Sequence, residues 1–459
     1  MTGTTAKNRS PGPIRVAFLL FYFEAWDSLA PVYEAMRASE LFDPVVLTLA
    51  RKLTGDSGYG GEREVHRFLA ENDIAHVRLK GNDHAANLEK LKSFEPDYVF
   101  LNYPWQRNYP PAFRPDNLVR FTRIAYIPYF FLPLVNEEFP EHRPLPAASI
   151  VEKNEPKKIA GHLFEQRVHQ LASLIFVQDN QSKDAFKGTS RGDSHVFVTG
   201  SPKLDVMKVS AEKFAQKRAK KIAKKRAQSK YDLRVLWAPH HSYSPAWLNF
   251  GRFAADHGEM LRFATSHPRI KLTLRPHPFL FGTLVDRGVL SESQLESWLE
   301  AWNALPNTRI SSTKSFLKQF TNNDLLLTDG ISFLAEYPLL MSKPAIFIEN
   351  PGHWSFNEVG NLAAACNLRI SRVSEFAGIA ETCMSDGFDA AVGGAAKRAD
   401  FASALARLRQ VVDPNPSSTA KRIIDITVAD FETSSPLVSA DLISELAWED
   451  RPGRELRDD

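Results

Sequence analysis

The stretch of sequence that most constrains the fold is NDLLLTDGISFLAEYPLLMSKPAIFIEN, residues 323–350. Leu325 to Thr328 is an apolar run of strand length, and Asp329-Gly330 is a turn signal. The pattern then predicts a helix over Ile331 to Leu340 and a second buried strand over Pro344 to Ile348. A strand–turn–helix–strand unit of this kind belongs to a mostly parallel sheet.

The start of the predicted helix is a candidate anion site. Free backbone N–H groups and the positive end of the helix dipole favour a diphosphate next to Asp329, Gly330 and Ser332. Glu336 follows about one and a half turns later, where a carboxylate accepts hydrogen bonds from ribose hydroxyls. The alternative is an ordinary βαβ unit in which Asp329 caps the helix.

Two predicted strands further upstream end in histidines. RVLWAP (residues 234–239) runs into His240 and His241, and KLTL (residues 271–274) runs into Arg275 and His277. Ligands of open parallel sheets bind outside the carboxyl ends of the strands, so these side chains are expected at one rim with Asp329. A lone histidine is more often structural, but several at matching strand ends favour a site.

A third segment of this type is HVFVT (residues 195–199), which ends at Gly200 and Ser201. Glycine lets a backbone approach phosphate closely, so this turn is also a predicted diphosphate contact.

VTGSPKLD, VLWAPHHS, LTLRPHP and the segment 323–350, in this order, resemble the motifs of the CDP-glycerol glycerophosphotransferases, the teichoic-acid primases and polymerases. The resemblance covers about residues 196–360. It implies the α/β GT-B fold, with two Rossmann-like domains facing each other across a cleft. It also implies that His277 is catalytic, that Asp329 and Ser332 hold the donor diphosphate, and that Glu336 is the acidic residue of the donor helix.

The chain departs from this family in its amino-terminal half. A His-Gly-Thr segment is usual there, whereas the strand Arg123 to Ile127 is followed by Pro128-Tyr129-Phe130. The pattern YIPYF resembles a divergent branch associated with surface polysaccharides. Without that histidine, Glu24 is the favoured base candidate, because it is an acid in a loop expected to face the cleft.

Aromatic residues at predicted strand ends are candidates for acceptor binding, because aromatic faces stack on sugar rings. The candidates are Trp26, Trp105, Tyr126 and Tyr129. The alternative for each of them is packing in the core.

Composition fits a large soluble enzyme. The chain has 459 residues, of which 43% are hydrophobic, and a net charge of +3, too small to indicate nucleic-acid binding. No apolar run reaches the length of a membrane helix, and the first residues lack the apolar core of a secretory signal. Cys366 and Cys383 match no disulfide framework or metal motif, which is typical of the cytoplasm.

The predicted domain organisation follows from alternating strands and helices. We expect a disordered start at 1–13, an acceptor-side domain at 14–205, a basic linker helix at 206–232, a donor domain at 233–430 and a tail at 431–459. The segment KFAQKRAKKIAKKRAQSK (residues 213–230) is dense in Lys and Arg. It is either a solvated helix or an interfacial helix attracted to anionic lipid at the inner face of the membrane.

The sequence therefore predicts a cytoplasmic transferase that uses a nucleotide-activated donor, such as CDP-glycerol, to build a surface polymer on a lipid-linked or oligosaccharide acceptor. Phosphate is expected to favour the protonated form of His277, which would act as acid or electrostatic clamp, and no metal or other cofactor is required. The alternatives are a glycosyltransferase that moves a sugar and an inactive scaffold of the same machinery.

Overall fold

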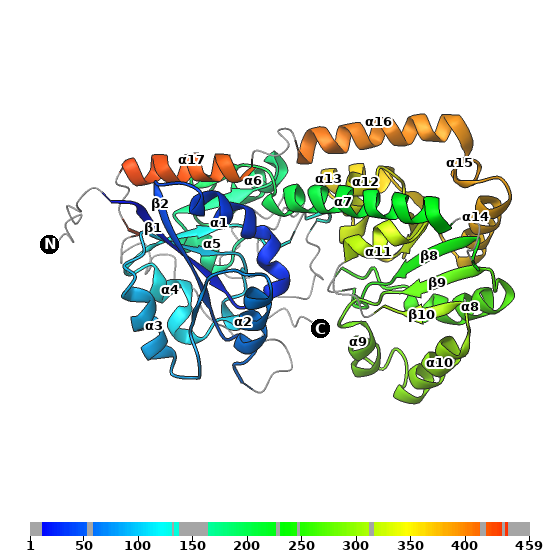
Figure 1. Cartoon of the computed structure of the whole chain (residues 1–459), viewed down its shortest axis with the longest axis horizontal. Helices are drawn as coiled ribbons and strands as arrows, with labels where there is room; N and C mark the ends of the chain where they lie inside the picture. Colours follow the sequence, from blue (N-terminus) through cyan, green and yellow to red (C-terminus); the bar gives the residue numbers. More distant parts are fainter. Residues whose placement is uncertain are drawn as a thin grey trace, which may run out of the picture. The chain divides into compact units, whose positions relative to one another are not determined.

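The computed structural model describes residues 12–52, 58–130, 133–136, 164–225, 230–245, 248–311, 316–413, 419–433 and 437–438. The chain forms two compact units (Figure 1). Unit 1 comprises Met1–Phe131, Pro144–Val206 and Val412–Asp459, and unit 2 comprises Leu132–Arg143 and Met207–Val411. The predicted disordered start at 1–13 and the tail at 431–459 fall largely outside the described residues.

Unit 1 is built on a seven-stranded sheet of order β3-β2-β1-β4-β5-β6-β7, in which every pair of neighbours is parallel. Its strands are β1 (Ile14–Leu20), β2 (Phe42–Thr48), β3 (Val77–Arg78), β4 (Tyr98–Leu101), β5 (Arg123–Tyr126), β6 (Leu174–Val177) and β7 (Val196–Val198). In β1, Ala17 and Leu19 pack into one core cluster, and Val16 and Phe18 into another. Both faces of this sheet are therefore buried, as parallel sheets require.

The helices of unit 1 cover those two faces. They are η1 (Phe23–Ser28), α1 (Ala30–Arg37), α2 (Glu62–Glu71), α3 (His84–Lys92), η2 (Gln106–Asn108), η3 (Pro111–Phe113), α4 (Pro115–Leu118), α5 (Arg167–Leu171), α6 (Asn180–Phe186) and α17 (Thr419–Glu432). The carboxyl-terminal α17 lies beside α1 (Figure 1), and Asp430 accepts a hydrogen bond from Tyr98 of β4 at 2.5 Å. Helix α17 is therefore part of the first unit.

Unit 2 is built on a six-stranded parallel sheet of order β10-β9-β8-β11-β12-β13. Its strands are β8 (Leu233–Ala238), β9 (Ile270–Leu274), β10 (Thr308–Ile310), β11 (Leu325–Thr328), β12 (Ile346–Ile348) and β13 (Leu368–Ile370). Two all-parallel sheets with helices confirm the predicted α/β class.

The helices of unit 2 are α8 (Phe253–Ser266), α9 (Leu280–Asp286), α10 (Glu292–Ala304), α11 (Phe316–Asn322), α12 (Ile331–Met341), α13 (Glu358–Ala365), α14 (Val373–Ser385), α15 (Phe388–Ala391) and α16 (Gly394–Val412). The core beneath α8 and α10 is aromatic: Trp237 of β8 stacks on Phe253 at 5.3 Å between ring centroids and meets Trp298 edge-on. This packing holds β8, whose carboxyl end carries the histidine pair.

A short segment from the first half of the chain, residues 133–136, packs within unit 2. Val135 forms an antiparallel bridge with Phe356, and Asn357 Nδ2 donates to the Pro133 carbonyl at 2.8 Å. Gly360 of α13 lies so close to Leu134 that a Cβ at this position would be 1.8 Å from the Leu134 carbonyl oxygen. Only glycine fits there, so Gly360 permits this close contact between α13 and residues 133–136.

The predicted basic helix is the continuation of α7 (Pro202–Lys225), which starts directly after Ser201. The division between the two units falls inside α7. Among the described residues, no helix is both long enough and apolar enough to span a membrane.

Candidate functional site

The order of the unit 2 sheet creates a topological switch point. From β8 the chain proceeds outward to β9 and β10, and it then returns to the other side of β8 for β11, β12 and β13. In open parallel sheets, ligands bind outside the carboxyl ends of the strands at such a switch point. His240 follows β8 and Gly330 follows β11, so the predicted rim residues lie at this point of the sheet.

Asp329 anchors the two sides of the switch point to each other. Its carboxylate oxygens accept the backbone N–H of His240 and the backbone N–H of Arg252, both at 2.6 Å. The residue is 1% exposed, and burial raises its pKa to about 8, against the opposing effect of these two hydrogen bonds. Both oxygens of Asp329 thus accept from backbone groups of other segments, and not from the first turn of α12 as the capping alternative would have it.

The loop after β9 is fixed to the loop after β8 in the same way. The N–H of Arg275 donates to the Trp237 carbonyl at 2.7 Å, and the N–H of His277 donates to the Pro239 carbonyl at 3.1 Å. The β8–β9 pairing therefore continues past both strands. Prolines at 276 and 278 restrict the backbone on either side of His277, so its ring leaves a rigid support.

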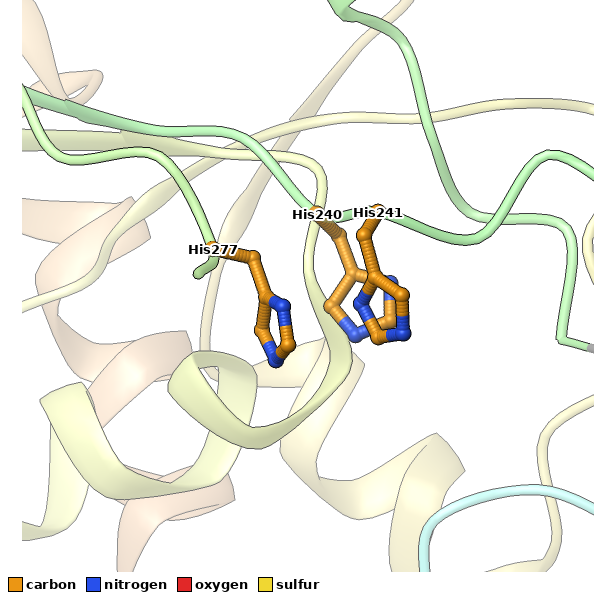
Figure 2. A group of neighbouring side chains, drawn as sticks. All are labelled: His240, His241 and His277. Carbon is orange, nitrogen blue, oxygen red and sulfur yellow. The ribbon is translucent and has the colours of Figure 1, made fainter. Parts of the chain in front are cut away.

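These supports bring three imidazoles together (Figure 2). The His241 and His277 rings are stacked with centroids 3.9 Å apart, His240 and His241 are 4.5 Å apart, and His240 and His277 are 5.4 Å apart. All three side chains are half-buried. The predicted convergence of His240, His241 and His277 is thus present in the structure, although their chemical roles stay a prediction.

The three imidazoles are neutral in the ligand-free protein. Burial lowers the pKa of His241 to about 4, and burial with the neighbouring rings lowers the pKa of His240 well below its usual range. The pKa of His277 is lowered well below its usual value by burial, then by His241 and by the Arg275 guanidinium. Without phosphate, desolvation and nearby cations both disfavour imidazolium at His277, so the protonated form expected from the sequence depends on a bound anion and stays a prediction.

The hydrogen bonds of two of these rings indicate where their protons lie. Backbone N–H groups of Ser242 and Phe279 point to Nδ1 of His240 and of His277, at 3.3 and 3.2 Å. An Nδ1 that accepts leaves the ring proton on Nε2, which then acts as an N–H donor. A neutral ring in this tautomer can still donate to a phosphate oxygen.

The first turn of α12 supplies backbone donors beside the histidines. The N-cap residue Gly330 makes no side-chain capping bond, and a Cβ there would be 3.2 Å from His240 Cβ. Glycine thus permits the close approach of β8 and α12. Ser332 is exposed in this turn, whereas Glu336 is 3% exposed. A ribose role for Glu336 therefore requires that a ligand reach a largely buried carboxylate.

Gly200 and Ser201 lie in unit 1, at the end of β7. Gly200 has a positive φ of +91°, and a Cβ there would be 2.9 Å from Thr419 Oγ1. Ser201 Oγ accepts the N–H of Leu204 at 3.3 Å in the first turn of α7. The observed contacts of both residues are with the ends of α17 and α7.

The predicted acceptor residues divide into core and surface. Trp26, Trp105 and Tyr126 are 4%, 8% and 1% exposed, so their rings pack in unit 1 and present almost no face to a sugar. Tyr129 is half-buried and stacks on Tyr103 at 4.6 Å between centroids. Glu24 is exposed at the carboxyl end of β1, in η1.

Some residues of these rims were not anticipated from the sequence. Ser242 is fully buried, and its hydroxyl meets His240 Nδ1 at 2.9 Å. Arg252 supplies the second N–H to Asp329. In unit 1, Tyr22 and Tyr103 neighbour each other, and Arg51 lies 5.2 Å above the Tyr22 ring. Ser242 follows the histidine pair directly in the sequence, which was the available signal; nothing local marks Arg252.

Sequence comparison finds no matching family model and no matching curated protein. Comparison of structures does find relatives. UDP-GlcNAc 2-epimerase from Neisseria meningitidis, bound to UDP-GlcNAc, matches with a TM-score of 0.52 and 13% identity, over 91% of this chain and 100% of that one.

Two further solved structures give a similar result. A putative UDP-N-acetylglucosamine 2-epimerase from Listeria monocytogenes matches with a TM-score of 0.53 and 14% identity, over 93% of this chain and 99% of that one. The wall teichoic acid polymerase TagF matches with a TM-score of 0.51 and 12% identity, over 92% and 90% of the two chains.

Sequence identities this low indicate a shared fold and nothing more. Each match extends over nearly the whole length of both chains, so it includes both parallel sheets of this protein. The chain has the GT-B fold, as predicted, and it resembles in structure both a teichoic acid polymerase and UDP-GlcNAc 2-epimerases.

Proposed function

We propose that this protein is an enzyme that binds a nucleotide-diphosphate-activated donor at the unit 2 switch point and transfers part of it to a cell-surface polymer. The observation that carries the proposal is the cluster of His240, His241 and His277 beside the uncapped first turn of α12. Imidazole N–H groups and free backbone N–H groups there present donors without a competing carboxylate, since Asp329 is occupied by backbone.

A diphosphate fits this set of donors. The helix dipole favours negative charge at the start of α12, and Arg275 at the end of β9 adds a full positive charge. Burial lowers the pKa of Arg275, yet an arginine stays protonated at neutral pH. Glu336, in the second turn of the same helix, is the proposed ribose contact.

The proposed chemistry is displacement at the donor diphosphate. With an alditol donor, the acceptor hydroxyl oxygen forms a bond to the phosphorus of the transferred group, and the bond from that phosphorus to the nucleotide phosphate breaks. His277 would stabilise the departing anion through its N–H, because donors placed where charge develops lower the barrier. The arriving anion also raises the pKa of the ring. The ring would then take up a proton, which it can give to the departing nucleotide.

The acceptor proton goes to a base, for which Glu24 is our candidate because it is exposed at a strand end of unit 1. Tyr129, stacked on Tyr103, is the aromatic face we propose for the acceptor, taken as a lipid-linked or oligosaccharide chain. The likeness to a wall teichoic acid polymerase supports this substrate class.

A second candidate is a reaction on a nucleotide sugar. Two of the structural relatives are UDP-GlcNAc 2-epimerases or are described as putative ones, and the same diphosphate cradle serves a sugar donor. This candidate includes a glycosyltransferase that expels a nucleoside diphosphate. An inactive scaffold would bind no donor.

Binding and product analysis with CDP-glycerol, CDP-ribitol and UDP-GlcNAc separate these candidates. We expect one of them to bind the full chain by calorimetry with a dissociation constant in or below the millimolar range typical of enzyme substrates. Mass spectrometry of the products then shows alditol phosphate transfer, sugar transfer or epimerisation.

Arg275→Ala tests whether binding occurs at the proposed rim. Loss of a charge-assisted hydrogen bond costs about 1.5–3 kcal/mol, or roughly a 10- to 150-fold weaker donor affinity. The matched control is Arg262→Ala, which removes an exposed guanidinium from α8 of the same unit and should leave affinity unchanged. Equal losses in both variants, or no donor binding at all, would contradict the proposal.

A further inference from the structure

We propose that His240, His241 and His277 together form a binding site for a divalent ion of the zinc type, with one coordination position left open. The inference does not rest on the proposed function, because it concerns what the three imidazoles bind in the absence of any nucleotide. It departs from the sequence-based expectation that no metal is involved.

The geometry of the cluster suits a single ion. In the described part of the chain, each of the three histidines offers a ring nitrogen, and these nitrogens all lie within 4.8 Å of one another. Figure 2 shows the three rings extending from the loops after β8 and β9 toward a common space. Tetrahedral zinc with bonds of about 2.0–2.1 Å needs nitrogens roughly 3.4 Å apart, so the His241 and His277 rings must rotate out of their stacked arrangement when the ion binds.

The support of the cluster is rigid, which lowers the cost of binding. The backbone of His240 is held by Asp329, and the backbone of His277 is held by the Pro239 carbonyl. Ligand groups that are already placed lose little freedom when an ion binds.

The surroundings of His240 match those of a metal ligand. Ligating histidines usually donate their second ring N–H to an oxygen, which orients the ring. His240 Nδ1 lies 2.9 Å from the buried hydroxyl oxygen of Ser242, which also accepts the N–H of Phe250 at 2.9 Å. Ligation through Nε2 requires the His240 proton on Nδ1, so binding breaks the contact in which Nδ1 accepts the Ser242 N–H at 3.3 Å.

His241 supplies an independent observation. Its Nδ1 is buried and has no hydrogen-bond partner among the described residues. A buried polar atom of this kind is costly unless something satisfies it, and an ion or water at the cluster is one such partner.

His277 adds a cost that binding must overcome. Its Nδ1 accepts the N–H of Phe279 at 3.2 Å, so ligation through Nε2 moves the ring proton to Nδ1 and breaks this contact. Phe279 is the N-cap residue of α9, and its carbonyl accepts the Thr283 N–H at 2.9 Å, so ligation leaves the Phe279 N–H without this partner. The cluster therefore has two tautomeric states, one that donates N–H groups to an anion and one that ligates an ion.

The donor atoms select the class of ion. Three imidazoles suit Zn²⁺, Ni²⁺ and Cu²⁺, whereas Mg²⁺ and Ca²⁺ prefer oxygen ligands, and no carboxylate or thiolate joins the group among the described residues. Three protein ligands with an open fourth position are the arrangement of catalytic rather than structural zinc. An oxygen of a phosphate could fill the open position.

Calorimetry on the untagged full chain, first freed of metal by chelation, tests the site with Zn²⁺ as the probe. We expect one equivalent to bind to the wild type, and Mg²⁺ to give no heat. His277→Ala and His241→Ala should each weaken the zinc affinity by about 100-fold or more, since even supporting residues change metal affinity 10–100-fold. His257→Ala, on α8 of the same unit, is the matched control and should bind as the wild type does.

Co²⁺ gives a second readout that does not depend on affinity. A tetrahedral Co²⁺ complex absorbs intensely in the visible range, and this band should appear in the wild type and vanish in both cluster variants. Thermal unfolding of each variant without metal verifies that it is folded. If a cluster variant is not folded, Ser242→Ala takes its place, and it should weaken zinc binding about 10-fold. Unchanged zinc affinity in folded cluster variants, or less than one equivalent bound by the wild type, would overturn the proposal.

Discussion

The Asp329 carboxylate and the His240 backbone N–H are joined by a 2.6 Å hydrogen bond. This bond crosses the switch point of the unit 2 sheet and ties the start of α12 to the loop that carries the histidine pair. Asp329 therefore acts on the site by fixing the backbone that carries the histidines, whatever ligand the site binds.

Replacing Asp329 with asparagine tests this role. Asparagine has one oxygen, so either His240 or Arg252 would face an NH₂ group in place of an acceptor. We expect a loss of about 1–3 kcal/mol in the free energy of unfolding, the cost of an unsatisfied buried group. Urea unfolding measures it, and Asp286→Asn, at an exposed position of α9, is the control that should change little.

The stability contributed by Asp329 should also depend on pH. Its pKa is raised to about 8 in the folded protein from an ordinary value of 3.8, so the folded state holds a proton that the unfolded state releases. This contribution is fully present below about pH 4 and is lost as the pH rises toward 8. The wild-type urea midpoint should fall between pH 5 and pH 8 more steeply than that of Asp329→Asn; parallel pH profiles would exclude the effect.

Gly360→Ala should detach the segment 133–136 from unit 2. A Cβ at this position would lie 1.8 Å from the Leu134 carbonyl oxygen, which requires a backbone shift. We expect a loss of more than about 2 kcal/mol in the free energy of unfolding, within the range of severe core changes. Gly378→Ala, at an exposed position of α14 with open space around it, should instead gain up to about 1 kcal/mol in the free energy of unfolding.

His277→Ala should lower turnover by about 100-fold or more once the donor is known, the usual range for a group that acts on the leaving atom. His240→Ala should act mainly on donor affinity. The control is His257→Ala, and the measurement is kcat and KM for each variant. Full turnover in His277→Ala would reduce this histidine to a structural role.

Glu336→Gln should raise the KM for the donor, because a neutral amide replaces a charged acceptor for the ribose. A loss of about 1.5–3 kcal/mol in binding corresponds to a roughly 10- to 150-fold higher KM. Glu336 is 3% exposed, so the unfolding midpoint must be measured alongside. A lower midpoint with unchanged KM would assign Glu336 to the stability of α12.

The basic half of α7 should bind anionic membranes if it is an interfacial helix. Replacing Lys213, Lys217 and the lysines that follow with glutamine should release the protein from phosphatidylserine vesicles, and added salt should do the same. Activity on a soluble acceptor should persist. Equal vesicle binding by the variant and the wild type at low salt would show that the helix is merely solvated.

Local patterns predicted several strands of unit 2 with ends within one or two residues of those observed, but not β10 or β13. The predicted strand at Leu325 to Thr328 has the observed bounds, because it is a short apolar run bounded by polar and turn residues. The helix predicted from Ile331 to Leu340 is observed as Ile331–Met341. Since parallel strands align their carboxyl ends, the same patterns also predicted that His240 and His277 lie at one rim.

The tertiary structure decided what the side chains at those ends do. Burial of Trp26 and Trp105 depends on the helices that pack over them, and local sequence does not contain that information. The neutral state of His277 depends on desolvation and on Arg275 and His241 together. The roles of Asp329 and of residues 133–136 rest on bonds to distant residues, such as Arg252 and Phe356. The sequence by itself determined the α/β class and the place of the rim; only packing between distant segments determined burial, charge and hydrogen-bond partners there.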